Sequence, residues 1–274
     1  MKKRTPPLRK RYWRKRSKNK ITKKKWKNRY YLTKIAKRKN TRAASMVEII
    51  KLIVEHYKLE TWWDNFTEEE KSAIVEIYEK HGDPVATVEY EDGTEMSRFE
   101  FLWHFSADIG FRDSIFDVDY DIFSKTVRFT DSVADDEKSY INRHFYHDRN
   151  IFVLYSHRNK YVGANELAIS ACEQQIAISQ KAAMQFLASP HPIPHLRKND
   201  ILPMHRSWLE IGGLPIHMGY KQLCIIHEKM ENWQEVIHLA EKAKSEGWPD
   251  GTAGGWDKRI KKARKKLGEL AKST

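Results

Sequence analysis

The first 42 residues hold 21 Lys or Arg and no Asp or Glu, and the first acidic residue of the chain is Glu48. A segment with so much like charge and so few apolar residues cannot bury enough surface to offset the entropy lost on folding. The rest of the chain has 29 basic and 37 acidic residues, a net charge of −8. We therefore expect a disordered basic arm over 1–42 that is attached to a separate folded body.

Charge divides the body into two further regions. Residues 43–135 carry 8 basic and 22 acidic side chains, whereas residues 136–274 carry 21 basic and 15 acidic ones. The whole chain is 40% hydrophobic and seven of its nine Trp lie in the body, so the body has ample material for a core. The pattern predicts a mainly α protein, with a small acidic α or α+β region over 43–135 and a helical region over 136–274.

Local signals in the acidic region favour helices but leave one hairpin open. Thr67 followed by Glu70 has the spacing of a capping box, which predicts a helix that starts there. Residues 85–93 are rich in Val, Thr and Tyr and end in Asp-Gly, so they predict a short hairpin, with a loop between helices as the alternative. Residues 97–105 are so aromatic that they belong to the core, on a strand or on a helix.

One acidic cluster in this region is a candidate metal site. Asp117, Asp119 and Asp121 alternate as the opening of a calcium loop does, but Ile122 stands where that loop requires Gly. On a strand the three carboxylates would share one face and could hold magnesium for phosphoryl-transfer chemistry. The simpler interpretation is a solvated acidic edge, which implies no metal.

The C-terminal region has the periodicity of paired helices. Residues 219–247 contain two amphipathic runs that a polar hinge at Glu231-Asn232 separates, which predicts a helical hairpin. A last amphipathic stripe begins at Trp256 and predicts a final helix. We predict that six residues form the core of the hairpin: Leu223, Cys224, Trp233, Val236, Ala240 and Ala243.

This hairpin resembles the tetratricopeptide repeat, in which a large and a small residue lie on the first helix and an aromatic opens the second. A weaker copy lies upstream, where 168–175 aligns with 236–243 after a first helix expected across 140–157. The resemblance covers about 140–270. It implies a short solenoid of helical hairpins that offers a concave surface to a protein or peptide.

Between the two copies, residues 189–217 contain five Pro and four His. Proline excludes a single helix here, so we expect a long loop that packs against the helices. The four histidines and the two cysteines could build a zinc site, but their spacing matches no zinc-ligand pattern. We therefore predict two buried free thiols, Cys172 and Cys224, with no disulfide, metal or cofactor.

The arm combines cations with aromatic residues. Lysine and arginine neutralise phosphates, and interleaved aromatic rings stack on unpaired bases, so the pattern favours RNA or single strands. The predicted contacts to nucleic acid are Arg9, Lys10, Arg11, Trp13, Arg14, Lys15, Arg16, Lys23, Lys24, Lys25, Trp26, Lys27, Arg29 and Tyr30.

The sequence alone thus favours a non-enzymatic helical-repeat adaptor that binds a protein or peptide and contacts nucleic acid through its arm. The alternative is a metal-dependent nuclease or related phosphoryl-transfer enzyme that uses the three aspartates. A third possibility is a protein–protein module whose arm docks on the acidic region. The arm could also be a targeting address, a lipid-binding patch or an extension upstream of a native start at Met46.

No segment has the roughly 18 apolar residues of a membrane helix, and no apolar region follows the basic arm as in a secretory signal. We expect a soluble intracellular protein, with the cytoplasm favoured. The oligomeric state and the identity of the partners are left open.

Overall fold

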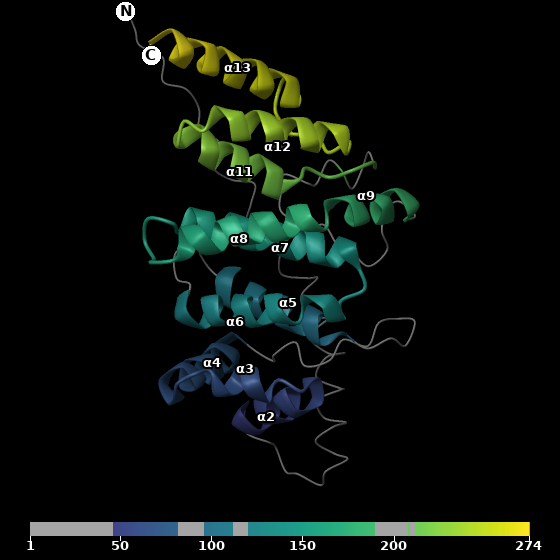
Figure 1. Cartoon of the computed structure of the whole chain (residues 1–274). Helices are drawn as coiled ribbons and strands as arrows, with labels where there is room; N and C mark the ends of the chain where they lie inside the picture. The colour runs from purple at the N-terminus through teal and green to yellow at the C-terminus, as the bar shows by residue number, and fades with distance from the viewer. Residues whose placement is uncertain (1–45, 82–95, 112–119, 190–207, 209–211, 274) are drawn as a thin grey trace, which may run out of the picture. The chain divides into compact units, whose positions relative to one another are not determined.

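A computed structural model describes residues 46–81, 96–111, 120–189, 208 and 212–273. These residues are mainly helical, and none of them forms a strand (Figure 1). The predicted mainly α class is therefore confirmed for the described part of the chain. The arm over 1–42 and the hairpin predicted around 85–93 lie outside the described residues.

The chain divides into two compact units, residues 1–105 and 106–274. Four helices enclose an aromatic core in the first unit: α2 (Met46–Tyr57), α3 (Glu60–Asp64), α4 (Glu68–His81) and α5 (Arg98–Phe111). Of α5, only the part up to Phe105 belongs to this unit. Trp62 of α3 meets Phe105 edge to face at 4.8 Å. The aromatic stretch predicted as core is thus helical, and its burial explains why it is so apolar.

Capping boxes start two helices of the first unit. The Thr67 amide donates to Glu70 Oε2 at 2.7 Å, and the Glu70 amide donates back to Thr67 Oγ1 at 3.2 Å, as the sequence predicts. Ser97 and Glu100 make the same reciprocal pair before α5. Each box satisfies two amides that the first turn of a helix leaves without partners.

The second unit contains α6 (Tyr120–Ser132), the short 3₁₀ helix η1 (Ala134–Asp136), α7 (Tyr140–Ser156), α8 (Ala164–Ala177) and α9 (Ser179–Ala188). Helix α7 packs along α8, and α8 packs on α11 (Met218–Lys229). Tyr146 of α7 and Gln174 of α8 both donate to the Asp131 carboxylate at the end of α6. These bonds join α6 to the helices that follow it, although the charge pattern groups α6 with the acidic region.

The last three helices are α11, α12 (Trp233–Ser245) and α13 (Gly255–Ser273). Figure 1 shows them stacked in chain order, with α12 between α11 and α13. The turn from α11 to α12 falls at Glu231-Asn232, the predicted hinge, where Glu231 adopts a φ of +57°. All six residues predicted for the hairpin core are buried.

Candidate functional site

The predicted nucleic-acid contacts, from Arg9 to Tyr30, lie outside the described residues. Asp117 and Asp119 lie outside them too, so the structure places only one member of the acidic cluster. Asp121 is exposed in the first turn of α6, on a helix rather than on the strand considered from the sequence. Among the described residues, no group of three or more His, Cys, Asp or Glu side chains could hold a metal ion.

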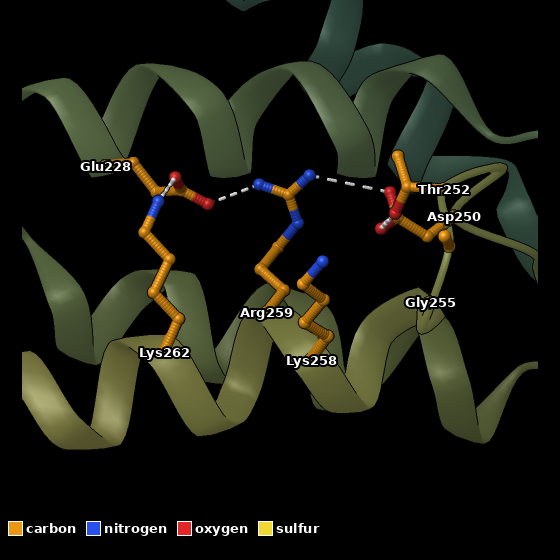
Figure 2. A pocket seen from close by; sticks show the side chains of 8 residues that line it. Glu228, Asp250, Thr252, Gly255, Lys258, Arg259 and Lys262 are labelled. Atoms are coloured by element: carbon orange, nitrogen blue, oxygen red, sulfur yellow. Dashed lines mark hydrogen bonds and ion pairs between the residues drawn. The ribbon is translucent and has the colours of Figure 1, made fainter.

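Two clusters of polar side chains stand out in the second unit. The first lines an open cavity of about 280 Å³ where α13 docks on α11 and on the loop after α12 (Figure 2). We call this cluster the ion-pair pocket. It is lined by Glu228, Asp250, Thr252, Ala253, Gly255, Lys258, Arg259 and Lys262.

Arg259 lies at the centre of the ion-pair pocket, with only 12% of its side chain exposed. Its guanidinium donates to Glu228 of α11 and lies 3.5 Å from Oδ1 of Asp250, whose side chain is 1% exposed. Thr252 donates to the other Asp250 oxygen at 2.5 Å, and Lys262 donates to Glu228 at 2.6 Å. The network holds α13 against α11 and the preceding loop, so its cations serve mainly to dock the helix.

Replacing Arg259 with Met should lower the free energy of unfolding by about 2–3 kcal/mol, because the buried Asp250 carboxylate then loses its only ion pair in the described part of the chain. The matched control is Arg264→Met on the same helix. Arg264 pairs with Glu241 at 2.6 Å but is 65% exposed, and such a pair contributes at most about 1 kcal/mol. Urea unfolding followed by circular dichroism measures both. Equal losses in the two variants would contradict the docking role.

The second cluster lies in the core between α7, α8, α11 and the loop that follows α12. We call it the histidine core. It consists of His144, His147, Asp148, Gln175, His217 and Trp248, all of which are buried.

Aromatic stacking packs one side of the histidine core. The His144 ring lies parallel to Trp248, with 5.1 Å between the ring centroids, and His217 meets the same indole edge-on at 4.8 Å. On α7, His144 Nε2 lies 3.6 Å from Asp148 Oδ2. A histidine of α7, the histidine that caps the start of α11 and a tryptophan of the loop after α12 thus share one interior space.

Gln175 of α8 ties the helices of the histidine core together. Its amide nitrogen donates to the Asp148 carboxylate and, at 2.9 Å, to the backbone oxygen of His144. Its amide oxygen accepts from the backbone of Gly219 on α11 at 2.6 Å. A β-carbon at Gly219 would lie 2.8 Å from the Cys172 carbonyl oxygen, so α11 can approach α8 this closely only because position 219 has no side chain.

The electrostatic character of the histidine core follows from its burial. Desolvation lowers the pKa of both His147 and His217 from 6.5 to about 3, and the nearby Arg143 adds to the effect at His147. Neither ring nitrogen of His147 has a hydrogen-bond partner among the described residues. Both rings are therefore neutral at pH 7 and pack as core residues, and only strong acid protonates them in the folded chain.

The two cysteines are free and buried, as predicted. Burial raises the pKa of the Cys172 thiol well above its usual range and that of Cys224 to about 12. Because the thiolate is the nucleophilic form, these groups are inert at neutral pH. They pack the helices and do not mark a reactive site.

Sequence reasoning missed the central residues of both clusters. Gln175 aligns with Ala243 of the second helical hairpin, so a long amide stands where a small apolar residue packs. That substitution is a sequence signal for a buried polar contact. No local pattern marks Asp250 or Arg259, because their pairing depends on the path of the loop between α12 and α13.

The chain matches no known family model, and searches of curated proteins and of solved structures likewise find no match. Within the described residues, no helix combines the length and the apolar character needed to cross a membrane.

Proposed function

We propose that the protein is a non-enzymatic helical-repeat adaptor that contacts nucleic acid through its basic arm and a protein or peptide through its helices. The single observation that carries the proposal is the separation of charge: 21 cations and no acid in 42 residues, next to a body of net −8. Such an arm binds phosphates without regard to sequence and releases counterions as it does so.

The helix pairs of the second unit support the adaptor part. Helices α7 and α8 form one packed pair and α11 and α12 form another, and the two pairs meet through α8 and α11. Successive packed hairpins are the arrangement of tetratricopeptide-like repeats, which bind peptides and proteins on the surfaces they expose.

The test compares the full chain with a chain that starts at Met46, the first residue of α2, so that every described helix is retained. We expect the full chain to bind a fluorescein-labelled 30-nucleotide oligouridine with a steep salt dependence. Removing the arm should lower the affinity at least about 100-fold at 0.15 M salt and flatten that dependence. Fluorescence anisotropy at several salt concentrations measures both.

Equal affinity of the two chains would contradict the tether. A change in oligomeric state on truncation, with oligouridine binding unaltered, would instead support docking of the arm on the acidic region. Analytical ultracentrifugation of both chains distinguishes these outcomes.

A further inference from the structure

The exposed face of α13 concentrates the positive charge of the C-terminal region. Residues 136–274 carry 21 basic and 15 acidic side chains, and α13 alone carries eight basic and two acidic ones. The other residues of this region therefore include 13 basic and 13 acidic side chains, which cancel. The entire positive excess of the region lies on its last helix.

Packing fixes which side of α13 faces outward. Trp256, Ile260 and Ala263 are buried, and Trp256 Nε1 donates to the backbone oxygen of Trp248 at 2.6 Å. Helix α12 covers this apolar stripe. The helix can neither rotate nor detach without losing these contacts, so its polar side stays turned away from α12.

Three lysines lie opposite the apolar stripe of α13, and we call them the α13 lysine row: Lys258, Lys261 and Lys265. Lys258 also lines the open side of the ion-pair pocket (Figure 2). All three are exposed, and they follow one another at spacings of three and four residues. Among the described residues Lys258 and Lys261 make no ion pair, whereas Lys265 lies 3.8 Å from Glu269 of its own helix. With a rise of 1.5 Å per residue, the row spans about 10 Å of helix.

The α13 lysine row lowers the stability of the helix taken by itself. Lysines three and four residues apart repel one another by about 0.2–0.5 kcal/mol a pair, and Lys262 and Lys266 lie close beside the row. By contrast, the cations that turn toward other helices are compensated: Arg259 and Lys262 pair with Glu228, and Arg264 pairs with Glu241. Lys258 and Lys261 thus carry charge that no acidic side chain among the described residues neutralises, and Lys265 has only a long ion pair at 3.8 Å.

We propose that the α13 lysine row is a second, folded contact for the phosphate backbone of a nucleic acid. This inference rests on the proposed nucleic-acid function and extends it from the arm to the body. Three ammonium groups along about 10 Å of a fixed helix complement a chain of phosphates, each of which carries one negative charge. Because the contacts of Trp256, Ile260 and Ala263 hold the helix in place, binding to it requires little ordering of the backbone.

The same geometry disfavours a lipid surface as the partner. An amphipathic helix binds a membrane by burying its apolar face among the acyl chains. In α13 that face is occupied by α12, since Trp256, Ile260 and Ala263 are each no more than 7% exposed. The outward side offers charge without an apolar face, which suits a polyphosphate backbone.

The test replaces the three lysines with Gln in the full chain, giving Lys258→Gln, Lys261→Gln and Lys265→Gln together. Three lost phosphate contacts should reduce the slope of log affinity against log salt by about 2 for single-stranded RNA, or about 50-fold in affinity at 0.15 M salt. The thermal midpoint should stay the same or rise, because repulsion is relieved. The matched control removes three exposed lysines elsewhere, Lys51, Lys138 and Lys160.

Anisotropy with labelled oligouridine and co-sedimentation with phosphatidylserine–phosphatidylcholine vesicles give the readouts. An unchanged slope in the α13 variant overturns the inference, as does an equal loss in the control. Vesicle binding that the α13 variant loses while RNA binding persists also overturns it, in favour of a membrane. A failure of the proposed arm function gives a different result. In that case the full chain and the chain that starts at Met46 bind RNA equally, while the α13 variant still loses affinity.

Discussion

Replacing Gln175 with Leu is expected to lower the free energy of unfolding by about 3–5 kcal/mol, the largest loss we predict from a single substitution. Leucine fills a similar volume but cannot donate to Asp148 or accept from Gly219. The Asp148 side chain is 1% exposed, so its charge would be left in the interior without its amide donor. Because Gln175 contacts α7 and α11 at once, the variant should weaken two helix interfaces together.

A matched control and a double variant separate this effect from a general cost of substitution. Gln180→Leu lies on the exposed side of α9 and should change the free energy of unfolding by no more than about 0.5 kcal/mol. The pair Gln175→Leu and Asp148→Leu should lose less than the sum of the two single variants, because each single variant already removes the hydrogen bond that the two side chains share. Urea unfolding followed by circular dichroism measures all four chains. Additive losses would show that the amide and the carboxylate act independently.

Acidification should destabilise the folded chain well above the pH at which carboxylates protonate. The folded-state pKa of His147 and of His217 is about 3, against 6.5 in the unfolded chain, so the unfolded chain takes up more protons below pH 6.5. Stability is therefore fully present above pH 6.5 and falls as the pH drops toward 3. Each histidine contributes up to about 1.4 kcal/mol per pH unit.

Asp131 acts in the opposite direction. Burial raises its pKa from 3.8 to about 6, against the hydrogen bonds from Gln174 and Tyr146, so the folded chain binds a proton there first. As the pH falls through 6, protonation of this carboxyl raises the free energy of unfolding and offsets part of the loss from one histidine. From pH 7 to pH 5 we expect a net loss of about 2–3 kcal/mol, because two histidines lose stability and one carboxyl regains part of it.

His147→Leu tests the origin of this pH dependence. The ring makes no hydrogen bond among the described residues, so the substitution should cost little at pH 7. The loss of stability between pH 7 and pH 5 should shrink by about 2 kcal/mol. The control, His238→Leu, removes an exposed histidine from α12. If the control flattened the profile as much as His147→Leu, the buried ring would not be the cause.

The sequence predicted the elements with strong local signals. The capping box at Thr67 and Glu70, the helix break at Glu231-Asn232 and the apolar positions of the last hairpin all depend on residues within one or two turns of each other. Periodicity and capping depend on residues close together in the chain, so they can be recognised from the sequence alone. The aromatic run over 97–105 could not be assigned to a helix or a strand, because a short apolar run fits both periods.

The buried clusters could not be predicted in the same way. Gln175 joins Asp148, 27 residues before it, to Gly219, 44 residues after it. The pairing of Arg259 with Glu228 similarly spans 31 residues. Contacts of this kind depend on the crossing of helices and the paths of loops, and the amphipathic pattern of each helix fixes neither.

By itself, the sequence determined that positive charge is concentrated in the arm and on the last helix, and that the C-terminal region consists of paired helices. Only the tertiary structure decided which cations are neutralised and which face outward, because that depends on how α13 docks against α11 and α12. It also decided that two histidines are core residues, because desolvation by neighbouring helices sets their charge.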